Sequence, residues 1–348
     1  MTIITSRAER DNNFDLLRLF GALLVIYGHS HALLGQAPPG FAANAVSTIG
    51  VKIFFCISGY LVSLSWLRDP RPGVFLVKRS LRIFPALIAI VLLTTFVMGP
   101  AVTRLPLSAY LENCLPYLRN IRLYISYGLP GVFETNIYPN AVNGSLWSLP
   151  VEFAMYFIAP IAIAGTARTG GKRVFATMAV GFIALAVWRT KIEPPPEQWV
   201  IYATSVWSAL DVAPYFAAGM IYAVCGLDRR FDIHVAFAAL FVIAVADTDA
   251  VVKEALLLLV LPYACLTFGT GRSSWHRFSR GTDLSYGMFL YGFPVQQLLI
   301  HAYGPRFTPW GLFGLTVPIA GLAAFLSWHL VEKRALRWKV RRAVTSGA

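Results

Sequence analysis

Residues 14–31 read FDLLRLFGALLVIYGHSH, and this stretch decides the fold. It is apolar enough to enter a bilayer, yet it contains four ionisable side chains: Asp15, Arg18, His29 and His31. Ionisable groups inside a membrane span are costly and usually face a protein interior or a wet cavity, so each is a functional candidate. On a helix, Arg18 and His29 lie three turns plus roughly 20° apart and point the same way, about 16 Å from each other along the axis. Asp15 is one turn before Arg18 and close enough to pair with it.

The composition extends this reading to the whole chain. Of its 348 residues, 57% are hydrophobic and only 14% are charged, whereas a soluble protein carries about a quarter charged residues. We therefore predict an all-α, polytopic integral membrane protein. Ten apolar runs are candidate transmembrane helices: 14–34, 46–67, 83–99, 149–166, 174–189, 203–225, 233–247, 254–270, 284–303 and 310–331. These runs show no internal repeat.

The basic residues predict the orientation in the membrane. Ten spans place both termini on one side, and the loops of that side carry an excess of Lys and Arg of roughly three to one. We predict that both termini are cytoplasmic and that the chain is a multi-pass protein of the bacterial cytoplasmic (inner) membrane. The net charge of +13 is then a topology signal, and nucleic acid is not expected as a partner. We expect a single transmembrane domain over 1–348, with no appended soluble domain.

Polar residues in the second and third spans are further candidates. Lys52 lies in the outer part of the second span, where snorkelling to the interface and a functional role are equally open. Ser58 and Gly59 are small residues that allow close helix packing. Arg79 and Arg82 are one turn apart at the expected cytoplasmic start of the third span. Two guanidinium groups beside a helix N-terminus suit phosphate, although an ordinary basic cluster that contacts lipid phosphates explains them equally well.

A long external segment, 100–148, precedes the fourth span and has the length of a lid or a binding loop. Glu152 is expected just inside the outer membrane face, with Tyr156 one turn deeper on the same side. The expected depth of Glu152 matches that of His29, which makes it a candidate for the same site. A structural carboxylate that gains from the helix dipole is the alternative. Asp211, in the sixth span, has no partner that the sequence identifies.

Five motifs in series resemble the acyltransferase-3 family of bacterial membrane acyltransferases. They are Arg18-x10-His29, FFCISGYL at 54–61, Arg79-x-x-Arg82, WSLPVE at 147–152 and SYGMFL at 285–290. The resemblance spans nearly the whole chain in the expected order. Two departures are present. Many members have His before the Pro of the ninth span, where this chain reads Gly292-Phe-Pro294, and many have Glu-x-Pro after the last span, where this chain reads Glu332-Lys-Arg334-Ala335.

The resemblance implies transfer of an acyl group, commonly acetyl from acetyl-CoA, to a hydroxyl of an exported or surface polysaccharide or a lipid-linked sugar. Acyl-CoA is then a donor substrate, and no tightly bound cofactor is expected. The four cysteines have no paired spacing, so no metal site is expected. Acceptor identity, acyl length and oligomeric state are left open.

The expected roles follow from this reaction. His29 is the general base toward the acceptor hydroxyl, with Glu152 orienting its ring; an acylated His29 intermediate is an open alternative. The donor-binding candidates are Arg18, Asp15, Arg79 and Arg82. The candidates for acceptor binding or for support of the site are Tyr156, Trp147, Asn143 and Lys52.

Two other functions fit a polytopic chain with polar groups near both membrane faces. A glycan or lipid transporter would move substrate without consuming acyl-CoA. A membrane scaffold in a polysaccharide synthesis complex is disfavoured because the cytoplasmic loops are short.

Overall fold

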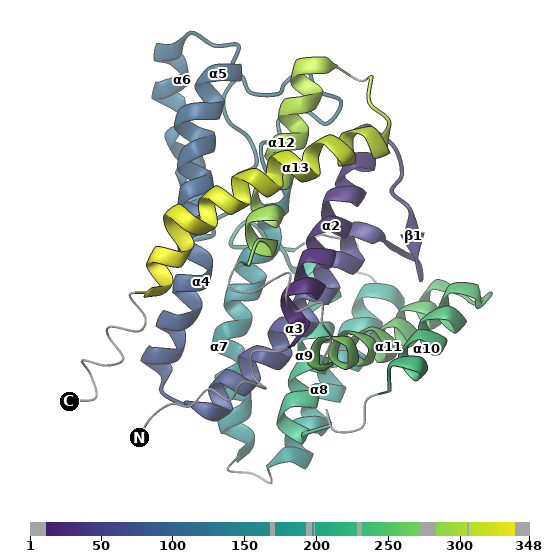
Figure 1. Ribbon diagram of the computed structural model, residues 1–348. Helices are drawn as coiled ribbons and strands as arrows, with labels where there is room; N and C mark the ends of the chain where they lie inside the picture. The colour runs from purple at the N-terminus through teal and green to yellow at the C-terminus, as the bar shows by residue number, and fades with distance from the viewer. Residues whose placement is uncertain are drawn as a thin grey trace.

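The computed structural model describes residues 12–167, 171–192, 197, 199–227, 232–271, 283–304 and 306–337. Ten long helices of this described part stand at the positions of the ten predicted spans (Figure 1): α2 (Phe14–Ala32), α3 (Val46–Arg68), α4 (Pro72–Leu93), α7 (Ser148–Ala167), α8 (Lys172–Val187), α9 (Val206–Cys225), α10 (Ile233–Val245), α11 (Ala250–Thr270), α12 (Ser285–Tyr303) and α13 (Pro309–Ser327). Seven helices of the described chain are long and apolar enough to cross a membrane. Helices α2 and α12, which contain polar residues, and the shorter α10 are not among them, so the count of ten spans stays a prediction. The cytoplasmic position of the termini, which lie outside the described residues, stays one too.

Short elements complete the fold. Two antiparallel hairpins, which the all-helical prediction did not include, precede α3 and α9: β1 (Gly40–Phe41) with β2 (Asn44–Ala45), and β3 (Val200–Ile201) with β4 (Thr204–Ser205). The remaining helical turns are η1 (Thr94–Met98), α5 (Gly99–Val102), α6 (Leu107–Asn113), η2 (Leu115–Arg122), η3 (Gly144–Trp147), η4 (Trp188–Ile192) and η6 (Trp328–Glu332).

The third predicted span is longer than the sequence suggested. Helix α4 begins at Pro72, where proline fits the first helical turn, and continues through η1 and α5 as one apolar rod to Val102. Arg79 and Arg82, expected in the cytoplasmic segment before the span, therefore lie well inside the helix. Both side chains line a cavity inside the helix bundle.

Helix α3 is the centre of the bundle. In its apolar window 67% of the residues are buried, against 11% in α8. Small residues allow its close packing. A Cβ on Gly50 would lie 2.5 Å from the Gly21 carbonyl oxygen of α2, and one on Gly59 would lie 2.0 Å from the Phe216 carbonyl oxygen of α9. The prediction that Gly59 permits a close helix contact is therefore confirmed.

The long segment 103–147, which the sequence predicts to be external, is fixed to α12. The Asn136 side chain donates to the side chain of Gln297 (2.8 Å), and the Gln297 side chain donates to the Ala141 carbonyl oxygen (2.7 Å). Asn143 donates to the Leu290 carbonyl oxygen (2.9 Å) and caps η3 through Ser145 N. These contacts fix where α7 begins and so set the depth of Glu152.

Candidate functional site

A buried polar cavity lies between α2, α3, α4, α7 and α12. Its free volume is about 70 Å³, and its polar lining residues are Arg18, Ser58, Arg79, Arg82, Ser148, Glu152, Tyr156, Ser285 and Tyr286. Predicted site residues from three separate helices thus meet at one place. Ionisable groups gathered in the interior of a membrane bundle are typical of a functional site.

Glu152 is held by hydrogen bonds from two helices. Ser58 of α3 donates to its carboxylate at 2.8 Å, and Tyr156 donates to the same oxygen at 2.6 Å. Tyr156 lies one turn after Glu152, as the sequence predicted. The partnership with Ser58 was not predicted, since nothing in the sequence told which side of the second span would meet the fourth.

Two of the three arginines are neutralised by carboxylates. Arg18 pairs with Asp15 at 2.9 Å, as predicted, and lies 4.0 Å from Asp283. Arg82 pairs directly with Asp283. Burial acts to raise the pKa of the Asp283 carboxyl, but the charges of Arg82 and Arg18 hold that pKa well below its usual range. Asp283, just before α12, is a site residue that the sequence reading missed.

Arg79 differs from the other two arginines. Its guanidinium lies over the rings of Phe75 (5.5 Å) and Tyr156 (5.8 Å). It makes no ion pair with any carboxylate in the described part of the chain, and its Nε is buried without a hydrogen-bond partner. A planar cation that is stacked on aromatic rings and lacks an anionic partner is suited to bind an anion.

His29 lies apart from this cavity. Its ring packs edge-on against Phe293 at 5.2 Å. The neighbouring Gly28 packs against Ser47 of α3, whereas Glu152 meets α3 at Ser58, about 16 Å further along that helix.

The predicted common depth of His29 and Glu152 is therefore wrong, and so is the predicted direct orientation of the His29 ring by Glu152. The cause is the external segment, which descends along α12 as far as Leu290. Helix α7 consequently starts near the N-terminal part of α12, far from the C-terminal end of α12, which is the end predicted to be outer. The sequence carries no signal for this descent.

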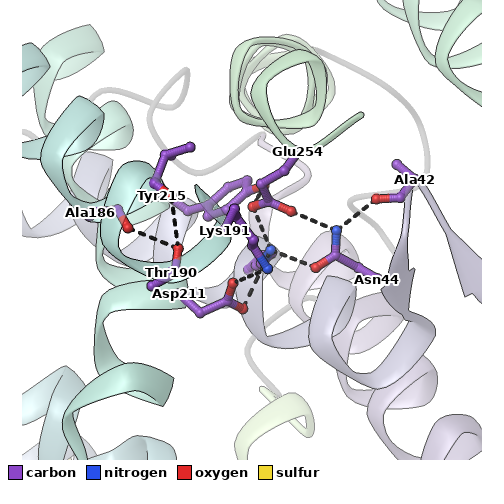
Figure 2. Close-up of polar contacts among 10 residues, drawn as sticks. Ala42, Asn44, Ala186, Thr190, Lys191, Asp211, Tyr215 and Glu254 are labelled. Carbon is purple, nitrogen blue, oxygen red and sulfur yellow. Dashed lines mark hydrogen bonds and ion pairs between the residues drawn. The ribbon is translucent and has the colours of Figure 1, made fainter. Parts of the chain in front are cut away.

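A second buried polar cluster, the Lys52 cluster, consists of Asn44, Lys52, Lys191, Asp211, Tyr215 and Glu254 (Figure 2). The Lys52 side chain is completely buried. Its ammonium donates to Asn44 and to Glu254, both at 2.7 Å. Snorkelling is therefore excluded, and Lys52 lines no part of the polar cavity.

Asp211 also gains partners in this cluster. Its carboxylate lies 3.5 Å from the Lys52 ammonium and 2.9 Å from that of Lys191. The sequence reading missed Glu254 altogether. A carboxylate in the apolar run of the eighth span was the available signal, because such a group needs a cation.

Two other predicted residues hold the segment 103–147 in place. Asn143 is buried and bonded to α12, and Trp147 is half-buried against the core. Neither lines the polar cavity. No group of three or more His, Cys, Asp or Glu side chains within the described residues is arranged to hold a metal ion.

The sequence is similar to known proteins over most of its length. The family model described as "Acyltransferase domain" (Acyl_transf_3) matches residues 11–331. An O-acetyl transferase of Shigella phage Sf6 is 28% identical over 349 residues, covering 94% of this chain and 97% of that protein. Nodulation protein 10 of Rhizobium leguminosarum bv. viciae is 30% identical over 364 residues, covering 94% and 93% respectively. No solved structure matches.

Proposed function

The chain belongs to the acyltransferase-3 family and is an acyltransferase, and we propose that it transfers an acetyl group from cytoplasmic acyl-CoA to a hydroxyl of an exported or surface glycan in the bacterial inner membrane. The observation that carries this proposal is the meeting of Arg18, Arg79 and Arg82 in one buried cavity. The name of the phage relative, an O-acetyl transferase, supports an oxygen acceptor and an acetyl group.

The arginines are the proposed site for the phosphate groups of the donor. CoA carries a diphosphate and a 3′-phosphate, and guanidinium groups bind phosphate in bidentate fashion. Among the described residues no carboxylate pairs with Arg79, so an anion can bind there without displacing one. Arg82 and Arg18 share Asp283, so a phosphate there competes with that carboxylate.

His29, near the end of α2 opposite to Arg18, is the proposed base. A long pantetheine arm separates the thioester of CoA from its diphosphate, so the two ends of the donor would contact two levels of one helix. His29 takes the acceptor's hydroxyl proton while the hydroxyl oxygen bonds to the thioester carbonyl carbon. The carbon–sulfur bond breaks, and CoA leaves as a thiolate that is then protonated. Because Glu152 is distant from His29, its role in this proposal is to fix Ser58 and Tyr156 beside the arginines.

The cavity must widen to take the donor. Its free volume of about 70 Å³ is far below the roughly 300–1,000 Å³ of ordinary ligand sites. The ion pair between Arg82 of α4 and Asp283 at the start of α12 closes one side. A phosphate that replaces Asp283 as the partner of Arg82 lets α4 and α12 separate and opens the cavity on this side.

Release of CoA thiol by purified protein tests the proposal, with acetyl-CoA and with or without a glycan acceptor. Arg79→Gln is expected to raise the KM for acetyl-CoA about 10- to 100-fold, since a hydrogen bond to a charged group contributes about 1.5–3 kcal/mol. Arg71→Gln is the matched control, because Arg71 is 66% exposed at the start of the same helix. If the wild type releases no additional CoA when the glycan acceptor is present, the proposed function is refuted.

A further inference from the structure

The structure contains an internal repeat that the sequence reading did not find. Helix α2, hairpin β1–β2 and helix α3 are followed, 160 positions later, by helix α8, hairpin β3–β4 and helix α9. Both hairpins turn through two non-glycine residues with positive φ. These are Ala42 (49°) and Ala43 (59°) in the first hairpin, and Tyr202 (52°) and Ala203 (56°) in the second.

Hydrogen bonds recur at the same spacing. Val46 N donates to the Pro39 carbonyl oxygen at 3.0 Å, and Val206 N donates to that of Trp199 at 2.9 Å. Near the end of the first helical segment of each unit, a hydroxyl bonds back to the preceding turn in the same manner. Ser30 of α2 donates to the Ile26 carbonyl oxygen (2.9 Å), and Thr190 of η4, which continues α8, donates to that of Ala186 (2.8 Å).

The two units meet through equivalent residues. A Cβ on Gly59 of α3 would touch the Phe216 carbonyl oxygen of α9, and a Cβ on Gly219 of α9 would touch the Cys56 carbonyl oxygen of α3. Gly59 and Gly219 are 160 positions apart, and so are Cys56 and Phe216. Reciprocal contacts of this kind define a two-fold axis, which here passes through the α3–α9 crossing.

The helices that flank this crossing also correspond. Glu152 is the fifth residue of α7 and Pro160 the thirteenth; Glu254 is the fifth residue of α11 and Pro262 the thirteenth. Both helices contact both members of the α3–α9 pair. The external segment 103–147 lies between α5 and α7, where the second unit has only 246–249 between α10 and α11. Glu254 of the Lys52 cluster is thus the repeat-related counterpart of Glu152 in the polar cavity.

The two carboxylates hold α3 from two sides. Ser58 donates to Glu152 of α7, and Lys52 donates to Glu254 of α11. Lys52 and Ser58 are separated by about 120° around α3, so they face different neighbours. A rotation or slide of α3 that breaks one contact also displaces the other.

We propose that the Lys52–Glu254 pair is a positioning device for the acyl-transfer site: it fixes α3 so that Ser58 stays against Glu152 beside the arginines. The proposal rests on the proposed function. A pair that only stabilised the fold would change the melting temperature and leave the catalytic constants alone. A positioning pair acts through Ser58, so its effect disappears once Ser58 is gone.

A double-mutant cycle tests the coupling. Lys52→Met with Glu254→Gln removes both charges and leaves no buried ion unpaired, and Ser58→Ala removes the contact to Glu152. Each change is expected to lower kcat at least tenfold with less than threefold change in the KM for the acceptor. The combined variant is expected to be no slower than Ser58→Ala. Ile243→Ala, in the core of α10, is the stability control and is expected to lower the melting temperature with kcat unchanged.

Two results would overturn the positioning role but not the proposed function. One is a combined variant whose loss of kcat equals the product of the two separate losses. The other is an unchanged kcat in the Lys52→Met, Glu254→Gln variant. A wild type that releases no CoA would overturn the proposed function, and the positioning role with it. If the charge-free variant does not fold, Tyr215→Phe takes its place, because it removes only the 2.9 Å bond to Glu254. Its smaller loss of kcat must likewise vanish when Ser58 is replaced by Ala.

Discussion

Replacing Lys52 by Met is the sharpest test of the packing around α3. The Lys52 ammonium is completely buried and makes two hydrogen bonds of 2.7 Å. Its removal leaves the Glu254 carboxylate buried without its nearest cation. Breaking a buried ion pair by removing one partner costs about 3–5 kcal/mol, because an uncompensated charge remains in a medium of low dielectric constant. Removing both charges is often nearly neutral, so Lys52→Met with Glu254→Gln is expected to recover most of this loss.

The free energy of unfolding, measured by SDS titration in mixed micelles, checks this ranking. Lys191→Met is the matched control, since its pair with Asp211 is less buried (27% and 21% exposed) and Asp211 keeps Lys52 at 3.5 Å, so this change is expected to cost less than Lys52→Met. A Lys52→Met variant as stable as Lys191→Met would refute the reasoning. So would a charge-free variant that is less stable than Lys52→Met.

Three further predictions follow from the site and the fold. His29→Ala is expected to abolish acyl transfer while the melting temperature and acetyl-CoA binding are kept, and full activity in this variant would exclude His29 as the base. The folded-state pKa of Asp283 is lowered, so its contribution to stability is present above the unfolded pKa of about 3.9 and is lost as the pH falls below that value. Between pH 3 and 7, the free energy of unfolding should therefore fall less steeply with decreasing pH in Asp283→Asn than in the wild type. Equal slopes of the two variants would contradict this. Gly59→Ala is expected to prevent folding in the membrane, because the added Cβ would lie 2.0 Å from the backbone of α9. Gly73→Ala is the control and should accumulate normally, since the space around Gly73 is open. Equal yields of the two variants would contradict the close α3–α9 contact.

Local sequence features predicted much of the fold. Long apolar runs gave the ten helical segments, because burying apolar side chains requires lengths that the sequence displays directly. The pair of Asp15 with Arg18 and the alignment of Glu152 with Tyr156 were also predictable, since helical spacing alone decides them.

Contacts between distant segments were not predictable. The depth of α7 depends on an external segment whose attachment to α12 uses side-chain amides, and amides carry no directional signal in a sequence. The repeat was not predictable because what recurs is hairpin geometry and helix crossings, while most side chains at equivalent positions differ and only a few, such as Gly59 and Gly219, are the same. Lys52 and Glu254 are 202 positions apart, so only the packing of α3 against α11 reveals the pair.

The central claim is that a donor bound by arginines at one membrane face serves an acceptor at the other. Proteoliposomes of uniform orientation, with radiolabelled acetyl-CoA on one side and the glycan on the other, test it most directly. Label should reach the glycan only when acetyl-CoA is on the side toward which Arg18 and Arg82 lie, and Arg79→Gln should slow that transfer at limiting donor. Transfer that requires donor and glycan on the same side, or that proceeds equally from either side, would contradict the account.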